Sequence, residues 1–251
     1  MMRSRFLQFM TALAALPISA CRILLTQPTR PLRKLQFEPQ GKEAQELVLL
    51  LPGRLSPPEE FVQYGIVDLV RKERPLARIV APDLHLGYYM RGLADVCLHE
   101  EIIGPAKKQG LRVMIIGVSM GGLGALTYSL RYPGEVDQMG LLSPFVGEKE
   151  LLAEIEKAGG LENWSSPVAT PRSKAEALKK MWMEMKRQWL SRSGPPFAIS
   201  LVVGTSDKLL TSNRFFARAL LKPEQLIEIE GGHDWDCWRR GVEILLSKSK
   251  D

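Results

Sequence analysis

The stretch from Arg112 to Gly124, RVMIIGVSMGGLG, constrains the fold of this chain more than any other. It begins with an uninterrupted apolar run, residues 113–116, which is typical of a strand buried on both faces. A helical pattern follows, with leucines at steps of three and four and a stop at Tyr-Pro-Gly, residues 132–134. The sequence therefore predicts a buried strand, a tight turn and a helix in direct succession.

The turn between these two elements contains the pattern Gly-x-Ser-x-Gly at residues 117–121. A sharp turn here lifts Ser119 clear of the sheet, and the glycines leave room where side chains would collide with neighbouring backbone. The helix N-terminus directs free N–H groups and a positive dipole end towards the same point. A glycine-rich turn with an idle serine is the alternative, so the motif depends on its strand, turn and helix context.

The sequence GVSMGGLGAL, residues 117–126, resembles the nucleophile elbow of the alpha/beta-hydrolase family. The resemblance implies an α/β fold, a mostly parallel sheet flanked by helices, with catalytic groups at the carboxyl ends of the strands. Strand and helix patterns alternate along the chain, as such a fold requires. Further strands are expected at 46–51, 77–81, 139–142, 199–203 and 226–229, after an edge strand near Leu35 and Phe37.

Helices are expected between these strands. Ser56 and Glu59 have the spacing of a capping box for a helix that follows the first long strand. The segment 92–107 is helical in outline and leads into the strand before Ser119.

Composition favours one sizeable domain, because the 251 residues are 45% hydrophobic. The net charge is +6, but the basic residues are spread among 28 acidic ones, so no nucleic-acid partner is expected. Cys21, Cys97 and Cys237 lack the spacing of metal ligands, and we expect no metal and no other cofactor. Cys97 and Cys237 are expected as buried free thiols rather than as a disulfide.

A serine nucleophile needs an imidazole to take its proton and a carboxylate to orient that imidazole. Among the three histidines, His233 is the expected base, because it lies in a glycine turn directly after the last strand. His85 follows another strand end, and His99 lies inside a predicted helix. The loop GGHDWDCW, residues 231–238, is also similar to the histidine loop of the putative-esterase branch of the family.

The family order places an acid after a strand and before the histidine. Asp207, at the end of Gly-Thr-Ser-Asp, meets both conditions and is the expected orienting acid. A role for Asp207 in a turn or a helix cap is the alternative. Asp234 and Asp236 are too close in sequence to His233 to orient it easily.

The resemblance also implies an oxyanion hole made by two backbone N–H groups, those of Met120 and Arg54. The family often has His-Gly where this chain has Pro-Gly at 52–53. The Arg54 side chain is expected in solvent, and binding of a substrate carboxylate or phosphate is the alternative.

Residues 147–193 are the insertion where the family typically carries its cap, here a small helical one. A capping box at 173–176 predicts a helix whose apolar stripe includes Trp182. Such a stripe is interpreted first as packing and second as a substrate-lining surface. Tyr88 and Tyr89 are candidates for the pocket wall under the same two interpretations.

Together these residues indicate a serine hydrolase that cleaves a carboxylic ester or thioester through an acyl-enzyme on Ser119. The expected substrate is a small-molecule or lipid ester, and the oligomeric state stays open. An acyltransferase with the same triad, which passes the acyl group to an alcohol rather than to water, is one alternative. A non-catalytic surface binding protein on the same fold is the other.

Residues 1–20 have the pattern of an export signal, with Arg3 and Arg5 before an apolar stretch that ends at Ile18. That stretch is shorter than a membrane span. The sequence Ile-Ser-Ala-Cys resembles the lipobox of bacterial lipoproteins, which implies lipidation of Cys21 as the first residue of the mature chain. Cleavage after Ala20 without lipid, or an uncleaved amphipathic anchor, are the alternatives.

All three interpretations imply export, and the lipobox implies a membrane-anchored protein of the bacterial cell envelope. Residues 21–43 are then a tether that includes the edge strand, and 44–251 form the alpha/beta-hydrolase domain.

Replacing Cys21 with serine tests the lipoprotein interpretation. The parent protein should fractionate with membranes, because an acyl chain contributes about 0.8 kcal/mol for each CH₂ group that it buries. Cys21→Ser should be released from membranes or remain unprocessed. The measurement is the intact mass of the membrane-extracted protein, and an unmodified start at Cys21 or an uncut Met1 would contradict lipidation.

Overall fold

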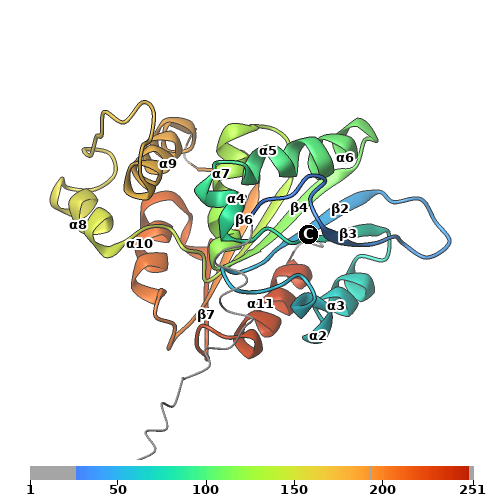
Figure 1. The fold of residues 1–251 in the computed structure, drawn as a ribbon. Coiled ribbons are helices and arrows are strands. Elements are labelled where there is room, and N and C mark those ends of the chain that lie inside the picture. The colour runs from blue at the N-terminus through green and yellow to red at the C-terminus, as the bar shows by residue number, and fades with distance from the viewer. Residues whose placement is uncertain (1–26, 193, 249–251) are drawn as a thin grey trace, which may run out of the picture.

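The computed structural model describes residues 27–192 and 194–248, which form a sheet covered by helices on both faces (Figure 1). The expected export signal and Cys21 lie outside these residues. The sheet has seven strands in the order β1-β3-β2-β4-β5-β6-β7. All neighbouring strands are parallel except β1 and β3, which confirms the predicted mostly parallel sheet.

The strands are β1 (Lys34–Phe37), β2 (Glu46–Leu51), β3 (Ala77–Pro82), β4 (Arg112–Val118), β5 (Gln138–Leu142), β6 (Ala198–Gly204) and β7 (Leu226–Ile229). The predicted edge strand near Leu35 is confirmed as β1, and the other predicted strands match to within a few residues. β4, which precedes Ser119, lies in the centre of the sheet and continues through Gly117.

The helices are α2 (Glu60–Gln63), α3 (Ile66–Glu73), α4 (Leu86–Met90), α5 (Ala94–Leu98), the π-helix η1 (His99–Ile103), α6 (Gly104–Lys108), α7 (Met120–Arg131), α8 (Lys149–Lys157), α9 (Lys174–Gln188), α10 (Leu210–Leu220) and α11 (Trp235–Lys248), with short 3₁₀ turns η2 (Leu190–Arg192) and η3 (Pro223–Gln225). The helix predicted at 92–107 is therefore three consecutive pieces, α5, η1 and α6.

Alternating strand side chains divide the core into two halves. In β2, Leu47, Leu49 and Leu51 face one half, whereas Val48 and Leu50 face the other, and all are fully buried. Each such side chain contributes about 1.5–3 kcal/mol by leaving water. Figure 1 shows α5, α6 and α7 on one face of the sheet and α2, α3 and α11 on the opposite face.

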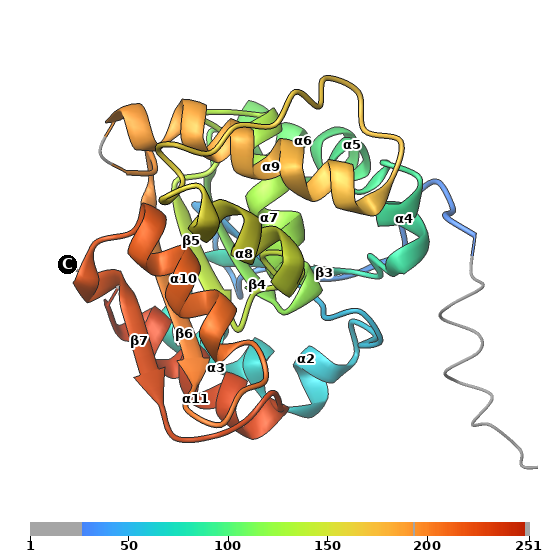
Figure 2. The ribbon, with the colours of Figure 1, turned by 90° about the vertical axis from the view of Figure 1, so that its left-hand side faces the viewer.

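The residues between β5 and β6, where the cap is expected, hold α8 and α9. α9 packs against α7, and α8 packs against α10 (Figure 2). Ser173 is the N-cap of α9, as the pattern at 173–176 predicted: the Glu176 N–H donates to Ser173 Oγ over 3.2 Å. The reciprocal bond of a capping box is replaced, because the Glu176 side chain accepts from the Arg172 N–H over 2.5 Å.

The capping box predicted at Ser56 is wrong. α2 begins at Glu60, has Glu59 at its N-cap and has no side-chain cap. Backbone turns occupy this segment instead, with the Glu60 N–H donating to the Pro57 carbonyl over 3.2 Å.

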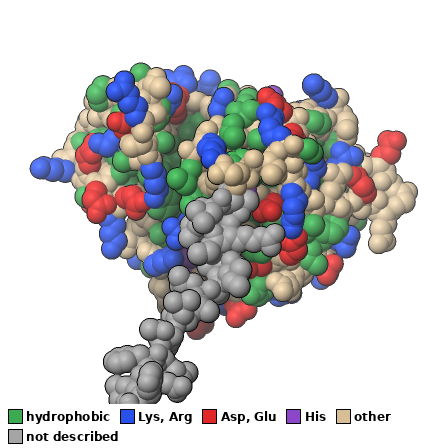
Figure 3. All heavy atoms as spheres, in the orientation of Figure 1, with side chains coloured by type: hydrophobic (Ala, Val, Ile, Leu, Met, Phe, Trp, Pro, Cys, Tyr) green, Lys and Arg blue, Asp and Glu red, His purple; other side chains and the backbone are tan. Residues whose placement is uncertain are grey.

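Both predicted buried cysteines are free thiols: Cys97 lies in α5 and Cys237 in α11. Among residues 27–192 and 194–248, no group of three His, Cys, Asp or Glu side chains is arranged to hold a metal ion. Within the same ranges, no helix combines the length and the apolar character needed to cross a bilayer. Basic and acidic side chains are intermixed on the face in Figure 3.

Replacing Gly121 with alanine tests whether α7 must pack this closely against β2. A Cβ at Gly121 would lie 2.1 Å from the Leu51 carbonyl oxygen. We expect Gly121→Ala to destabilise the protein by about 3 kcal/mol or more, because rigid backbone would have to move. Gly134→Ala is the control: φ there is +86° and nothing lies within 4 Å, so it carries only left-handed strain of about 1–2 kcal/mol. Equal losses of stability in denaturant titrations of the two variants would contradict the expectation.

Candidate active site

Ser119 occupies the turn between β4 and α7 with a strained backbone, φ 51° and ψ −111°. Residues other than glycine rarely adopt positive φ, and the surrounding structure must maintain such a conformation. The Ser119 N–H donates to the Leu142 carbonyl, and the Phe145 N–H donates to the Ser119 carbonyl, each over 2.9 Å. The turn is thus fixed by backbone hydrogen bonds to the end of β5 and the residues after it.

Three of the predicted side chains meet at the carboxyl end of the sheet. His233 Nε2 lies 3.0 Å from Ser119 Oγ. His233 Nδ1 lies 3.0 Å from Asp207 Oδ1 and 2.9 Å from Asp207 Oδ2. The residues follow β4, β6 and β7, so the parallel sheet brings them together from positions up to 114 residues apart in sequence.

Asp207 is held as an anion. Its side chain is fully buried, and burial raises the pKa of Asp207. Hydrogen bonds from His233, Ser143 and the Leu209 N–H lower it by more, so the pKa lies below its ordinary value. The Leu209 bond, 2.7 Å to Oδ1, also places Asp207 in the turn before α10, so the turn role and the contact with His233 occur together.

The charge on Asp207 determines which proton His233 carries. An ionised carboxylate only accepts hydrogen bonds, so Nδ1 is the protonated ring nitrogen. Nε2 is then free to accept the proton of Ser119 Oγ. This arrangement can generate an alkoxide nucleophile and return the proton to a leaving group.

Close backbone packing brings the histidine loop to Asp207. The Ser206 N–H donates to the Gly231 carbonyl over 2.9 Å. A Cβ at Gly204 would lie 2.3 Å from that carbonyl oxygen. The loop after β7 therefore lies directly against the end of β6.

The two predicted oxyanion residues belong to segments that border Ser119. Met120 is the first residue of α7, where backbone N–H groups have no partner inside the helix. A Cβ at Gly53 would lie 3.8 Å from Ser119 Cβ, so the loop after β2 approaches the serine. Arg54 follows in the turn closed by the Ser56 N–H on the Gly53 carbonyl, 3.3 Å, and its side chain is exposed.

The other histidines have contacts elsewhere. His85 caps α4, with Nδ1 accepting from the Gly87 N–H over 3.2 Å. His99 Nδ1 lies 3.0 Å from Glu135 Oε2, and the ring stacks on Tyr132.

The candidate pocket residues Tyr88 and Trp182 are buried, which favours the packing interpretation over a contact with substrate. The Tyr88 side chain is 1% exposed, and its hydroxyl donates to the Thr29 carbonyl over 2.9 Å. Trp182 is 0% exposed and donates from Nε1 to the Val146 carbonyl over 2.8 Å. Both therefore follow the packing interpretation. The Tyr89 hydroxyl is also buried, against the position where Gly124 would carry a Cβ.

Sequence reasoning missed two residues beside the acid–base pair. Ser143 follows β5 directly, is fully buried and has φ +46°. Trp238 donates from Nε1 to Ser143 Oγ over 3.4 Å, and its ring lies 5.0 Å from that of His233. Two features of the sequence could have indicated these residues. Ser143 lies at the end of the strand next to the one that precedes Ser119, and Trp238 lies in the histidine loop.

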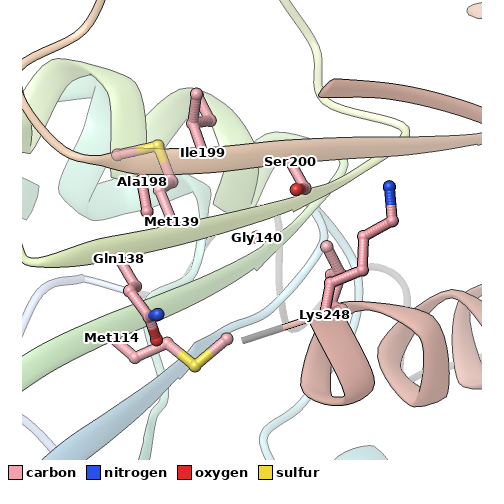
Figure 4. A pocket seen from close by; sticks show the side chains of 9 residues that line it. Met114, Gln138, Met139, Gly140, Ala198, Ile199, Ser200 and Lys248 are labelled. Atoms are coloured by element: carbon pink, nitrogen blue, oxygen red, sulfur yellow. The ribbon is translucent and has the colours of Figure 1, made fainter. Parts of the chain in front are cut away.

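A shallow depression lies at the end of the sheet opposite the candidate active site (Figure 4). It is lined by residues at the amino ends of β4, β5 and β6, such as Gln138 and Ser200, and by Lys248 of α11. Ser119 and Asp207 follow the carboxyl ends of these parallel strands. The depression is therefore separate from the candidate active site.

Solved structures with the same fold include several hydrolases. A ferulic acid esterase is 19% identical, with a TM-score of 0.61 over 86% of this chain and 91% of that chain. The fluorophosphonate-binding serine hydrolase F of Staphylococcus aureus is 16% identical, with a TM-score of 0.61 over 88% and 92%. Est1E from Butyrivibrio proteoclasticus is 15% identical, with a TM-score of 0.55 over 86% and 92%. At these identities the likeness shows the fold.

No curated protein sequence gives a significant match to this chain. The family model described as "Putative esterase" matches residues 103–242, which is more than half of the chain and includes Ser119, Asp207 and His233. The chain therefore belongs to the putative esterase family and is an ester hydrolase with the alpha/beta-hydrolase fold.

Proposed function

We propose that this chain cleaves a carboxylic ester or thioester through a covalent acyl-enzyme on Ser119. The observation that carries the proposal is the continuous hydrogen-bonded line from Ser119 Oγ to His233 Nε2, 3.0 Å, and from His233 Nδ1 to the Asp207 carboxylate, 2.9 Å. A nucleophile, a base and an orienting acid in this order are the arrangement that acyl transfer requires.

In the first step, Ser119 Oγ attacks the carbonyl carbon of the ester while His233 Nε2 takes the hydroxyl proton. The carbonyl oxygen becomes an oxyanion, which the N–H groups of Met120 and Arg54 stabilise. When the tetrahedral intermediate collapses, the bond to the leaving oxygen or sulfur breaks. His233 Nε2 returns its proton to that atom, and the acyl group stays on Ser119.

In the second step, water attacks the acyl carbon while His233 Nε2 takes one of its protons. Collapse of the second tetrahedral intermediate breaks the bond to Ser119 Oγ, which receives the proton back from Nε2. The carboxylic acid leaves. Asp207 stays ionised throughout and stabilises the imidazolium that forms in each half-reaction.

Ser119→Ala tests the nucleophile. It removes one hydroxyl, so the fold should persist, whereas kcat for a soluble p-nitrophenyl ester should fall by about 10⁴ or more. Ser247→Ala, on the exposed face of α11, is the matched control and should keep the parental rate. A fluorophosphonate should add its mass to the Ser119 peptide of the parent. Near-parental turnover by Ser119→Ala, or a label on another residue, would refute the assignment.

Asp207→Asn tests the orienting acid. The amide can present a donor where Nδ1 needs an acceptor, so kcat should fall by about 10²–10⁴. KM should change little, because the lost interaction strengthens only as the imidazole gains charge in the transition state.

Asp234→Asn and Asp236→Asn are the controls for this prediction. Both side chains are exposed, and Asp234 caps α11 by accepting from the Cys237 N–H over 2.9 Å, a bond that asparagine can also accept. A large loss of kcat in either control, together with a nearly parental kcat in Asp207→Asn, would show that the orienting acid lies in the histidine loop.

A further inference from the structure

Ser143 has a backbone conformation that serine seldom adopts. Its φ is +46°, in the left-handed region, and the side chain is fully buried after the end of β5. This region is unfavourable for a residue with a Cβ, and glycine adopts it without that cost. A serine at a position suited to glycine points to a use for its hydroxyl.

The residues around Ser143 hold this conformation in place. The Ser143 N–H donates to the Val202 carbonyl over 2.9 Å, which ties it to β6. The next carbonyl, that of Pro144, accepts from Asn213 Nδ2 over 2.8 Å, and Asn213 is fully buried in α10. These bonds fix the backbone position from which the Ser143 hydroxyl projects.

The partners of the hydroxyl determine where its proton points. Trp238 Nε1 lies 3.4 Å from Ser143 Oγ, and an indole N–H can only donate. Ser143 Oγ is thus the acceptor in this contact, and its own proton remains available. A hydrogen bond from Ser143 is one of the causes that lower the pKa of Asp207, and an ionised carboxylate can only accept such a bond.

This bond completes a set of three donors around the buried carboxylate. The Leu209 N–H reaches Oδ1 over 2.7 Å, and His233 Nδ1 lies within 3.0 Å of both oxygens. Ser143 is the third donor, and it comes from the residue that follows β5.

Trp238 contacts the other member of the pair as well. Its ring lies 5.0 Å from the His233 ring at an interplanar angle of 86°. It is itself packed edge-on against Trp235 at 5.3 Å, and Trp235 Nε1 donates to Glu60 Oε2 over 2.9 Å. Trp235, which is hydrogen-bonded to α2, therefore supports the Trp238 indole. The Trp238 indole contacts His233 directly and Asp207 through Ser143.

We propose that Ser143 and Trp238 are positioning residues for the Asp207–His233 pair: Trp238 orients the Ser143 hydroxyl, and Ser143 holds the Asp207 carboxylate in the plane that faces His233. This inference rests on the proposed function and adds two residues to it. Neither residue contacts the Ser119 hydroxyl, so both act on catalysis through the orientation of the acid–base pair. Their loss should lower kcat and leave KM nearly unchanged.

Four variants of the full chain test the inference, assayed for kcat and KM on one soluble p-nitrophenyl ester. Ser143→Ala removes the hydroxyl and keeps the left-handed strain. Ser143→Gly removes the hydroxyl and relieves the strain, so it should fold even if Ser143→Ala does not. Trp238→Phe keeps a ring beside His233 and loses the N–H donor. The fourth variant combines Ser143→Ala with Trp238→Phe.

We expect kcat to fall about tenfold in both Ser143 variants, with KM within about twofold of the parental value, as for loss of a hydrogen bond to a charged group. Trp238→Phe should lower kcat by about threefold. The double variant should match Ser143→Ala, because Trp238 acts through the hydroxyl and the two losses are then not additive. Ser129→Ala is the matched control: this buried serine in α7 bonds to the Leu126 carbonyl, and kcat should stay parental.

Parental kcat in Ser143→Gly would overturn the inference, since strain rather than the hydroxyl would then explain any loss in Ser143→Ala. A double variant with multiplied losses would overturn the route from Trp238 through Ser143. Fluorophosphonate labelling distinguishes failure of the proposed function from failure of this inference alone. No label on Ser119 in the parent would overturn the proposed function and this inference with it. A labelled, active parent with undiminished Ser143 variants would overturn this inference alone.

Discussion

The backbone contact between the start of α7 and the end of β2 is the constraint on which the site depends. A Cβ at Gly121 would lie 2.1 Å from the Leu51 carbonyl oxygen, so the first turn of α7 rests directly on the neighbouring strand. Ser119, directly before this turn, has a φ of 51° at the carboxyl end of the central strand. The loop after β2 also lies beside the serine, where Gly53 approaches Ser119 Cβ. The candidate nucleophile and the expected oxyanion donors therefore all border one packing contact.

Local sequence patterns predicted this part of the molecule well, because they act over short distances. The apolar run at 113–116 indicates a buried strand whatever its neighbours are, and Gly-x-Ser-x-Gly restricts the turn that follows. His233 could be selected because a glycine turn after a strand end leaves few positions for its ring. Asp207 could be selected because a parallel sheet gathers strand ends at one edge. These two choices needed only the order of the strands, and the structure places both side chains in hydrogen-bonding contact.

Contacts that depend on three-dimensional packing could not be predicted in this way. Nothing in the residues around Ser143 indicates a positive φ, because that angle arises where β5 ends between the Ser119 turn and β6. The burial of Trp182 depends on how α9 packs on α7, and the helical stripe alone suits a packed surface and a pocket wall equally well. At Ser56 the capping pattern was present, but two prolines turn the backbone before α2 begins, and the local signal was misleading.

The electrostatics of Asp207 explain why such nonlocal contacts gather at the acid. A fully buried carboxylate is unfavourable as an anion, and only donors around it can reverse that preference. The hydrogen bond from His233 is the largest of the effects that lower the pKa of Asp207, but in the proposed mechanism the His233 ring gains and loses a charge in each half-reaction. The Ser143 hydroxyl and the Leu209 N–H do not change charge, and their smaller contributions lower the pKa of Asp207 in the same direction. The carboxylate is therefore stabilised partly by groups outside the proposed proton transfer, in which His233 Nε2 exchanges its proton with Ser119 and the leaving group.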